Sequence, residues 1–155
     1  MVGPEDEKNA TVRRASSMLV AGASLSVPVF MLCLRKGYGL GAQAMAMGSF
    51  HVPQFTIAWP TGEFGPMGLE GAVRLGYSKE LDAAGIEGSA AREALFDKLV
   101  SAMYESGKAL NVAMYHEIDA VIDPRDTRKW IMNGIRSMPT GKKGGKGKRP
   151  FIDTW

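Results

Sequence analysis

The stretch that decides the fold is Val29-Phe-Met-Leu-Cys-Leu34, followed by Arg35-Lys-Gly-Tyr-Gly-Leu-Gly41 and Ala42-Gln-Ala-Met-Ala-Met47. The first part is a continuous apolar run, which is typical of a strand covered on both faces in an α/β protein. The alternating glycines of the second part indicate a loop, and the third part has the composition of a short helix. The sequence of elements is therefore strand, glycine loop and helix.

Glycine is over-represented around this unit. The chain has 19 glycines among 155 residues, and 11 of them lie between Gly37 and Gly88. The usual share is about 7%. This concentration indicates that backbone groups have a role in the segment.

Towards the N-terminus, Asp6–Ala21 is predicted to be a helix, and a serine-rich turn is predicted to lead into a buried strand, Pro28–Leu34. The uncharged stretch Ala15–Leu34 is 20 residues long, which is the length of a membrane span. However, it contains four serines and a central proline, and positive charge at both ends gives no orientation signal. Two elements of a soluble protein explain it better than a span. Acidic residues at Glu5–Glu7 also disfavour a signal peptide.

Towards the C-terminus, Phe55–Trp59 is a second strand candidate that ends before Pro60 and Gly62. Short helices are expected over Leu69–Leu75 and Lys79–Ala84.

The last third has clearer signals. Ser89 is a candidate N-cap for a helix that ends at Gly107. Its apolar stripe consists of Leu95, Phe96, Leu99, Val100, Met103 and Tyr104. Ala109–Ala113 is expected to be helical and Ile118–Ile122 extended. Asp123-Pro124 then favours the start of a final helix, because Asp suits the cap and Pro the first position. The apolar side of that helix is expected to comprise Trp130, Ile131, Ile135 and Met138.

The charge of the chain is concentrated in its tail. The net charge is +3, but the segment 139–155 has five Lys or Arg and one acid, so it carries +4 and the rest −1. No aromatic residues alternate with these lysines, so a solvated extension is favoured over a nucleic-acid-binding arm. The single cysteine, Cys33, excludes an internal disulfide and favours a cytoplasmic location.

Residues for the common catalytic constellations are scarce. His51 and His116 have no ligand spacing for a metal, so no metal site is predicted, and Cys33 within an apolar run is expected to be an inert core thiol. Glu63 lies among Gly and Pro, and suits either a cleft carboxylate or a structural one.

A dinucleotide-binding loop is an alternative interpretation. Gly37, Gly39 and Ala42 fit the pattern G-x-G-x-x-A, and Glu63 lies 21 residues after Ala42. Pro60 and Gly62 interrupt the place where such an acid should end a strand, and further alternating strands and helices are missing. The pattern alone is therefore weak.

Four strings, in order, resemble the C-terminal half of the carboxyltransferase subunit of biotin-dependent acyl-CoA carboxylases, the propionyl-CoA carboxylase beta-chain family. They are Leu34-Arg-Lys-Gly-Tyr-Gly-Leu-Gly-Ala-Gln-Ala-Met45, Ala58-Trp-Pro-Thr-Gly-Glu63, Met67-Gly-Leu-Glu-Gly-Ala-Val73 and Ile118-Asp-Ala-Val-Ile-Asp-Pro-Arg-Asp-Thr-Arg-Lys-Trp130. The resemblance runs from about Met1 to Arg136, and the closing segment 149–155 resembles the ends of some members.

The resemblance implies a crotonase-like (ClpP/crotonase) α/β spiral fold and a partial C-terminal carboxyltransferase domain over residues 1–138, with 139–155 as a basic flexible tail. It implies carboxyl transfer from carboxybiotin, carried by a partner domain, to the α-carbon of an acyl-CoA such as propionyl- or acetyl-CoA. No tightly bound cofactor and no side-chain base are then expected, since backbone N–H groups form the oxyanion holes.

The resemblance also implies which residues form the site. The oxyanion donors align with the N–H groups of Leu40 and Gly41, and the pocket residues with Gly39, Ala42, Gln43, Glu63, Met67 and Gly68. Two positions depart from the family pattern: Leu40 replaces a glycine, and Gln43 replaces an aspartate linked to acyl-chain selectivity.

The resemblance does not extend to the N-terminal half of the subunit, which binds the acyl-CoA in the family. The expected partners are therefore that half, a biotin carboxylase and biotin carrier subunit, and further copies in a homo-oligomer, without nucleic acid or membrane. The chain is expected to be a fragment that is inactive alone. A non-catalytic assembly module with the same fold is the remaining alternative.

Overall fold

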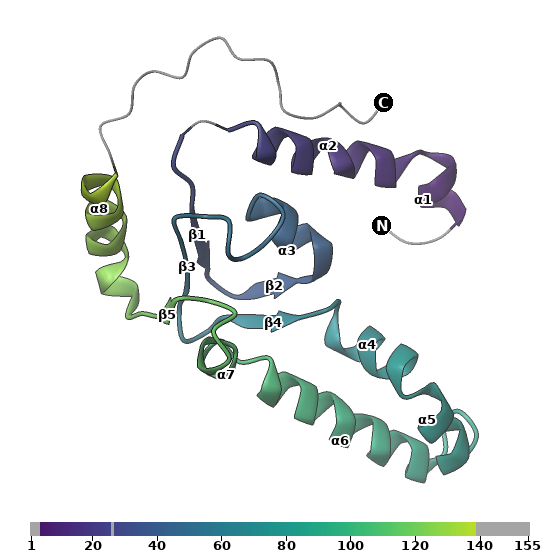
Figure 1. Ribbon diagram of the computed structural model, residues 1–155. Helices are drawn as coiled ribbons and strands as arrows, with labels where there is room; N and C mark the ends of the chain where they lie inside the picture. Colours follow the sequence, from purple (N-terminus) through teal and green to yellow (C-terminus); the bar gives the residue numbers. More distant parts are fainter. Residues whose placement is uncertain (1–3, 26, 139–155) are drawn as a thin grey trace.

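Two small parallel sheets form the centre of the molecule. The computed structural model describes residues 4–25 and 27–138 (Figure 1). The first sheet has the order β1-β3-β5, from β1 (Phe30–Cys33), β3 (Phe55–Ala58) and β5 (Ala120–Val121). The second pairs β2 (Lys36–Tyr38) with β4 (Glu63–Gly65). All of these ladders are parallel, as expected for an α/β protein.

The core lies on both faces of the central strand, β3, whose four residues are all buried. On one face, Phe55 and Ile57 pack with Ile122 and with Trp130 of the last helix. On the other face, Ala58 packs with Cys33, Phe64, Ala109 and Ile118. Because side chains alternate along a strand, this four-residue segment joins two clusters that would otherwise be separate.

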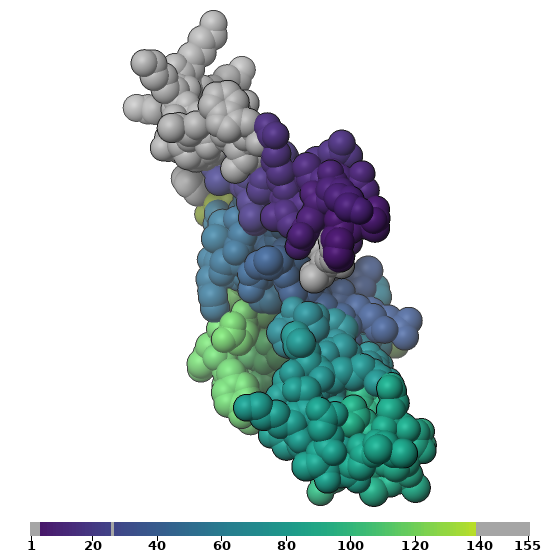
Figure 2. Space-filling view, turned by 90° about the vertical axis from the view of Figure 1, so that its right-hand side faces the viewer, coloured from purple at the N-terminus to yellow at the C-terminus, as the bar shows by residue number. Residues whose placement is uncertain are grey.

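The helices surround these sheets (Figure 1). The N-terminal pair is α1 (Pro4–Lys8) and α2 (Thr11–Ala23), and α2 lies against α3 (Gly39–Met45). The final turn η1 (Pro124–Asp126) and helix α8 (Thr127–Ser137) follow β5. Between β4 and β5 the chain forms α4 (Leu69–Gly76), α5 (Ser78–Ala84), α6 (Ala90–Ser106) and α7 (Ala109–Met114). The first three of these form a helical arm at one end of the molecule, coloured teal in Figure 2.

Several elements confirm the sequence prediction. Strand β3 and helices α4 to α7 begin or end within two residues of the predicted bounds. The Asp123 side chain accepts a hydrogen bond from the Arg125 N–H at 2.9 Å, so it caps as expected. The six predicted residues of the α6 stripe are all half-buried. Ser89 occupies the N-cap position of α6 but makes no side-chain cap bond.

Three predictions about the elements were wrong. The single helix Asp6–Ala21 is two helices, because Ala10 has a left-handed backbone with φ 53° between them. Strand β1 is not covered on both faces, since it is a sheet edge and Phe30, Met31 and Leu32 are only half-buried. The last helix turns part of its predicted apolar side outwards, where Ile135 is 50% exposed.

Strands β2 and β4 were not predicted. Each has three residues, which is too short for a periodicity, and each contains a glycine, which sequence patterns treat as a strand breaker. In β4 the glycine leaves room for a neighbour: a Cβ on Gly65 would lie 2.5 Å from the Leu69 Cδ2, so the Leu69 side chain would have to shift. The predicted tail, 139–155, lies outside the described residues. None of the helices in the described part of the chain has the length and apolar character needed to cross a membrane.

Candidate functional site

A cleft of about 620 Å³ lies between the start of α3, strand β4 and the end of α6. Its walls are mainly apolar side chains and glycine backbone. The lining residues are Gly39, Leu40, Gln43, Phe50, Phe64, Gly65, Pro66, Leu69, Met103, Ser106, Gly107, Val112 and Glu117. Glu117 is the only ionisable side chain among these lining residues, so the cleft offers little side-chain acid or base.

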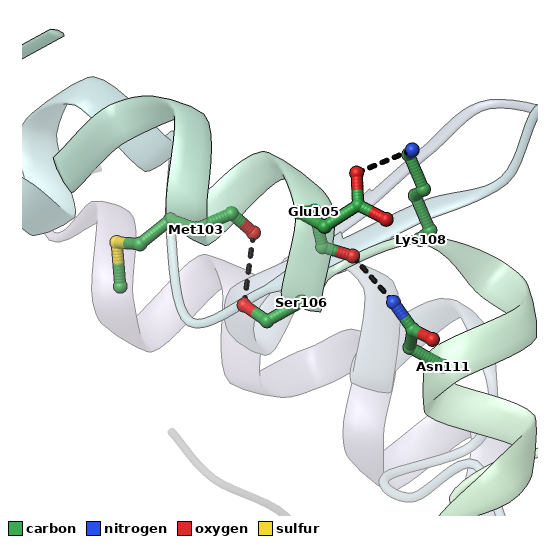
Figure 3. Close-up of polar contacts among 5 residues, drawn as sticks. All are labelled: Met103, Glu105, Ser106, Lys108 and Asn111. Carbon is green, nitrogen blue, oxygen red and sulfur yellow. Dashed lines mark hydrogen bonds and ion pairs between the residues drawn. The ribbon is translucent and has the colours of Figure 1, made fainter. Parts of the chain in front are cut away.

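The wall at the end of α6 is held by local hydrogen bonds (Figure 3). The Ser106 Oγ donates to the Met103 carbonyl at 3.1 Å, and the Asn111 Nδ2 donates to the Glu105 carbonyl at 2.6 Å. Lys108 forms an ion pair with Glu105. These contacts fix the turn from α6 to α7 beside the cleft.

The opposite wall is the start of α3, where the chain passes directly from strand to helix. Gly39 has φ +60°, and a Cβ there would lie 2.6 Å from the Pro66 carbonyl oxygen. Helix α3 begins at Gly39, not at Ala42 as predicted, so the predicted glycine loop is divided between β2 and the first turn of the helix. The N–H groups of a first helical turn have no partner within the helix. Those of Leu40 and Gly41 belong to this turn.

The structure brings only some of the predicted site residues into the cleft. Gly39, Leu40 and Gln43 line it. Gly41 and Ala42 are not among the lining residues; Gly41 is exposed, and a Cβ added to it would meet no atom within 4 Å. Ala42 is half-buried in the same helix.

The remaining predicted pocket residues lie outside the cleft lining. Met67, 38% exposed, and Gly68, also exposed, follow Pro66 at the surface. The Glu63 carboxylate faces Tyr38, whose hydroxyl donates to its Oε2 at 2.8 Å. Of the two sequence interpretations of Glu63, the structure therefore favours the structural one.

Sequence reasoning missed most of the wall at the end of α6. Met103, Ser106 and Gly107 come from a segment about 40 residues after β4, and no motif connected them with the glycine segment. The only sequence signal for this wall was Gly107, which was interpreted only as the end of a helix. A Cβ on Gly107 would lie very close to the Phe64 carbonyl oxygen, so this glycine allows α6 to approach β4.

The other candidate groups are separate from the cleft. His51 and His116 are exposed. Within the described ranges, no three His, Cys, Asp or Glu side chains group closely enough to hold a metal ion.

Cys33 is 4% exposed, and burial raises the pKa of its thiol above the ordinary value. Its Sγ contacts the Arg35 carbonyl at 3.3 Å. We therefore expect the folded chain to react with iodoacetamide at pH 8 at least about tenfold more slowly than the urea-unfolded chain, because the thiolate is the reactive form. Since Cys33 is the only cysteine, mass spectrometry of the alkylated chain measures this directly. Equal rates in both states would contradict an inert core thiol.

The comparisons with known proteins agree on one family. A model of the carboxyl transferase domain matches residues 1–146. The chain is 31% identical over 148 residues to the propionyl-CoA carboxylase carboxyltransferase subunit of Haloferax mediterranei, covering 95% of this chain and 28% of that subunit. It is 30% identical over 141 residues to the methylmalonyl-CoA carboxyltransferase 12S subunit of Propionibacterium freudenreichii subsp. shermanii, covering 91% and 26% respectively.

Solved structures give the same result. A single-chain, multi-domain long-chain acyl-CoA carboxylase matches with a TM-score of 0.72 and 57% identity, over 86% of this chain and 12% of that one. The transcarboxylase 12S hexamer, with methylmalonyl-CoA bound, matches with a TM-score of 0.78 and 25% identity, over 100% of this chain and 29% of that one. The chain thus spans about a quarter of the length of its curated relatives.

Proposed function

The chain belongs to the carboxyl transferase domain family, and from this membership we propose that it is the C-terminal part of an acyl-CoA carboxylase carboxyltransferase subunit. In this proposal it helps to transfer a carboxyl group from carboxybiotin to the α-carbon of an acyl-CoA such as propionyl- or acetyl-CoA. The observation that carries the proposal is a cleft at the start of α3 whose lining includes Gly39, Leu40 and Gln43. These residues belong to one of the strings that resemble the family.

The cleft suits a reaction that backbone groups catalyse. Carboxybiotin, when bound, supplies the activated carboxyl group. The N–H groups of Leu40 and Gly41 are proposed to hold the negative oxygen that develops during transfer. Because a Cβ on Gly41 would meet no atom within 4 Å, the backbone there is open to a ligand oxygen. Preorganised donors of this kind are worth a few kcal/mol each.

The other predicted residues have supporting roles in this proposal. Gln43 lines the cleft at the position linked to acyl-chain selectivity in the family, so it is proposed to contact the acyl group. Ala42, Met67 and Gly68 are proposed to border the biotin side, next to Leu40 and Pro66. Glu63 acts from behind the wall, through Tyr38.

A dinucleotide site is a weaker interpretation of the same glycines. Strand β2 separates β1 from α3, and the proposed nucleotide acid, Glu63, begins a strand and accepts a hydrogen bond from Tyr38. A ribose-binding acid should instead follow the end of the second strand. The family match removes the remaining reason for this alternative.

The proposal includes other chains. The relatives are named as subunits, and the 12S neighbour is described as a hexamer. We therefore propose that this chain works with an N-terminal carboxyltransferase half that holds acyl-CoA, with a biotin carboxylase and biotin carrier, and in a homo-oligomer. Residues 1–138 are the proposed domain and 139–155 a basic tail. A cytoplasmic location is supported by the single cysteine.

The test is carboxyl transfer with and without the complementary half. The chain alone is expected to give no malonyl- or methylmalonyl-CoA from carboxybiotin, because no acyl-CoA half is supplied. A chimera is expected to be active, in which this chain replaces the matching quarter of the Haloferax subunit. Turnover is measured by mass spectrometry of the carboxylated CoA product.

The possible outcomes separate the alternatives. Robust turnover by the chain alone would contradict its dependence on a complementary half. A chimera that assembles to the size of the unmodified subunit but gives no product would favour the non-catalytic assembly module. The unmodified subunit, assayed in parallel, is the matched control.

A further inference from the structure

The hydrogen bond between Tyr38 and Glu63 joins the two strands behind the cleft. Tyr38 is the last residue of β2, and Glu63 is the first residue of β4. The strands pair in parallel with Tyr38 opposite Gly65, so the tyrosine reaches back diagonally to Glu63 on the same face of the sheet. The hydroxyl lies 2.8 Å from the carboxylate Oε2.

The backbone around Glu63 is fixed on both sides. The Glu63 N–H donates to the Arg35 carbonyl at 2.6 Å, and the Phe64 N–H donates to the Gly107 carbonyl at 2.8 Å. Glu63 also forms an antiparallel bridge with Lys108. Glu63, which accepts the Tyr38 hydrogen bond, is therefore held both by β2 and by the end of α6. The end of α6 forms the wall of the cleft that faces α3.

The donor of this bond is attached to the start of α3. Tyr38 is the N-cap residue of that helix and makes no side-chain cap bond, so its hydroxyl remains available for Glu63. A Cβ on Gly65 would lie 3.6 Å from the Tyr38 Cδ1, which shows that the ring lies against the β4 backbone. Leu40 and Gly41 are only two and three residues further along the chain.

A second tyrosine–glutamate pair lies beside the first, and its tyrosine, Tyr104, also interacts with Tyr38 and Glu63. The Tyr104 hydroxyl donates to the Glu70 Oε1 at 2.9 Å, which joins α6 to α4 at the surface. Burial, followed by the bond to Glu63, raises the pKa of Tyr38 well above its ordinary value, so this hydroxyl stays a donor at neutral pH. For Tyr104 the bond to Glu70 is the first cause of its raised pKa.

We propose that Tyr38 and Glu63 form a positioning pair that holds the first turn of α3, and with it the N–H groups of Leu40 and Gly41, against the cleft. The catalytic consequence of this inference rests on the proposed function. Glu63 acts as a hydrogen-bond acceptor, not as an acid, a base or a ligand of the substrate. Neither side chain is required to touch the reacting atoms.

The test uses three substitutions in the pair and one matched control. Tyr38→Phe and Glu63→Ala remove the bond, and Glu63→Gln keeps an acceptor without the charge. Tyr115→Phe removes the hydroxyl of a tyrosine that is 79% exposed, and it is the control. The backbone order parameters of the Leu40 and Gly41 N–H groups are measured by NMR relaxation on the full chain, and kcat and KM are measured on the chimera.

Tyr38→Phe and Glu63→Ala are expected to lower the order parameters of both N–H groups from about 0.85 to below about 0.6. They should also lower kcat about tenfold, since a hydrogen bond to a charged acceptor is lost. The KM for acyl-CoA should change less than about twofold, because that substrate is held mainly by the other half. The double variant should lose no more than either single one, and Glu63→Gln should recover most of the loss. Tyr115→Phe should leave the two order parameters and kcat unchanged.

Three results would overturn the inference. Unchanged order parameters in Tyr38→Phe would show that the bond does not hold the turn. An equal decrease in Tyr115→Phe would show general loosening instead of positioning. A Glu63→Gln variant with unchanged order parameters but the low kcat of Glu63→Ala would show that the charge itself acts on the reaction. If the unsubstituted chimera is inactive, the proposed function fails, and the order parameters still decide whether the pair positions the turn.

Discussion

Replacing Gly41 with valine is expected to lower carboxyl transfer by the chimera at least about 100-fold, with little effect on folding. The loss is expected because the branched side chain would cover the N–H groups of Leu40 and Gly41 that are proposed to hold the developing oxyanion. Folding should survive because a Cβ at this position meets no atom within 4 Å, and because the backbone of Gly41 does not have the positive φ that would strain a valine. Product formation by mass spectrometry gives the rate, and size-exclusion chromatography gives the assembly state.

Gly76→Val is the matched control for this experiment. Gly76 also lies in a helix, and a Cβ there also meets no atom within 4 Å, but it ends α4 and is not part of the first turn of α3. The two variants carry the same added side chain and the same modest helix penalty of a β-branched residue. Full turnover by Gly41→Val, or an equal loss in Gly76→Val, would remove the α3 amides from the mechanism.

Replacing Gly39 with alanine is expected to destabilise the folded chain by about 1–3 kcal/mol. Two causes act together. An L-residue is strained at the φ of +60° that Gly39 adopts, and its Cβ would lie 2.6 Å from the Pro66 carbonyl oxygen, which is backbone and cannot rotate away. The free energy of unfolding is measured by urea denaturation of the full chain, followed by circular dichroism.

Gly41→Ala supplies the control for this second prediction. It adds the same methyl group in the same helical turn, but into open space. Because alanine is a better helix former than glycine, this variant should be unchanged or stabilised by roughly 0.5–1 kcal/mol. If both variants lost the same stability, the close approach between Gly39 and Pro66 would not be the cause.

The sequence predicted the elements whose signals are local. The stripe of α6, the strand Phe55–Ala58 and the Asp123 cap all depend on a few neighbouring residues, and the structure contains each of them. The break at Ala10 escaped prediction because alanine is the best helix former, and a left-handed backbone at alanine has no sequence signal. The exposure of β1 escaped because an apolar run predicts burial without saying which chain provides the cover.

The candidate site was predictable on one side only. Gly39, Leu40 and Gln43 were found through their resemblance to a family and do line the cleft. The wall formed by Met103 and Ser106 depends on a tertiary approach between α6 and β4, which no local pattern encodes. The partner of Glu63 was missed for the same reason, since Tyr38 is 25 residues away in sequence.

The parallel ladder between β3 and β5 has a consequence for synthesis on the ribosome. Ile57 pairs with Ala120, so one edge of the central strand stays open until the whole helical arm has been translated. The arm makes its helix contacts among neighbours in sequence, and local contacts form quickly, whereas the ladder closes a long loop and forms slowly. A nascent chain that has left the tunnel only as far as α6 therefore has a folded arm beside an unpaired strand. Such a strand edge is prone to aggregation, so this is the stage at which a chaperone is most useful.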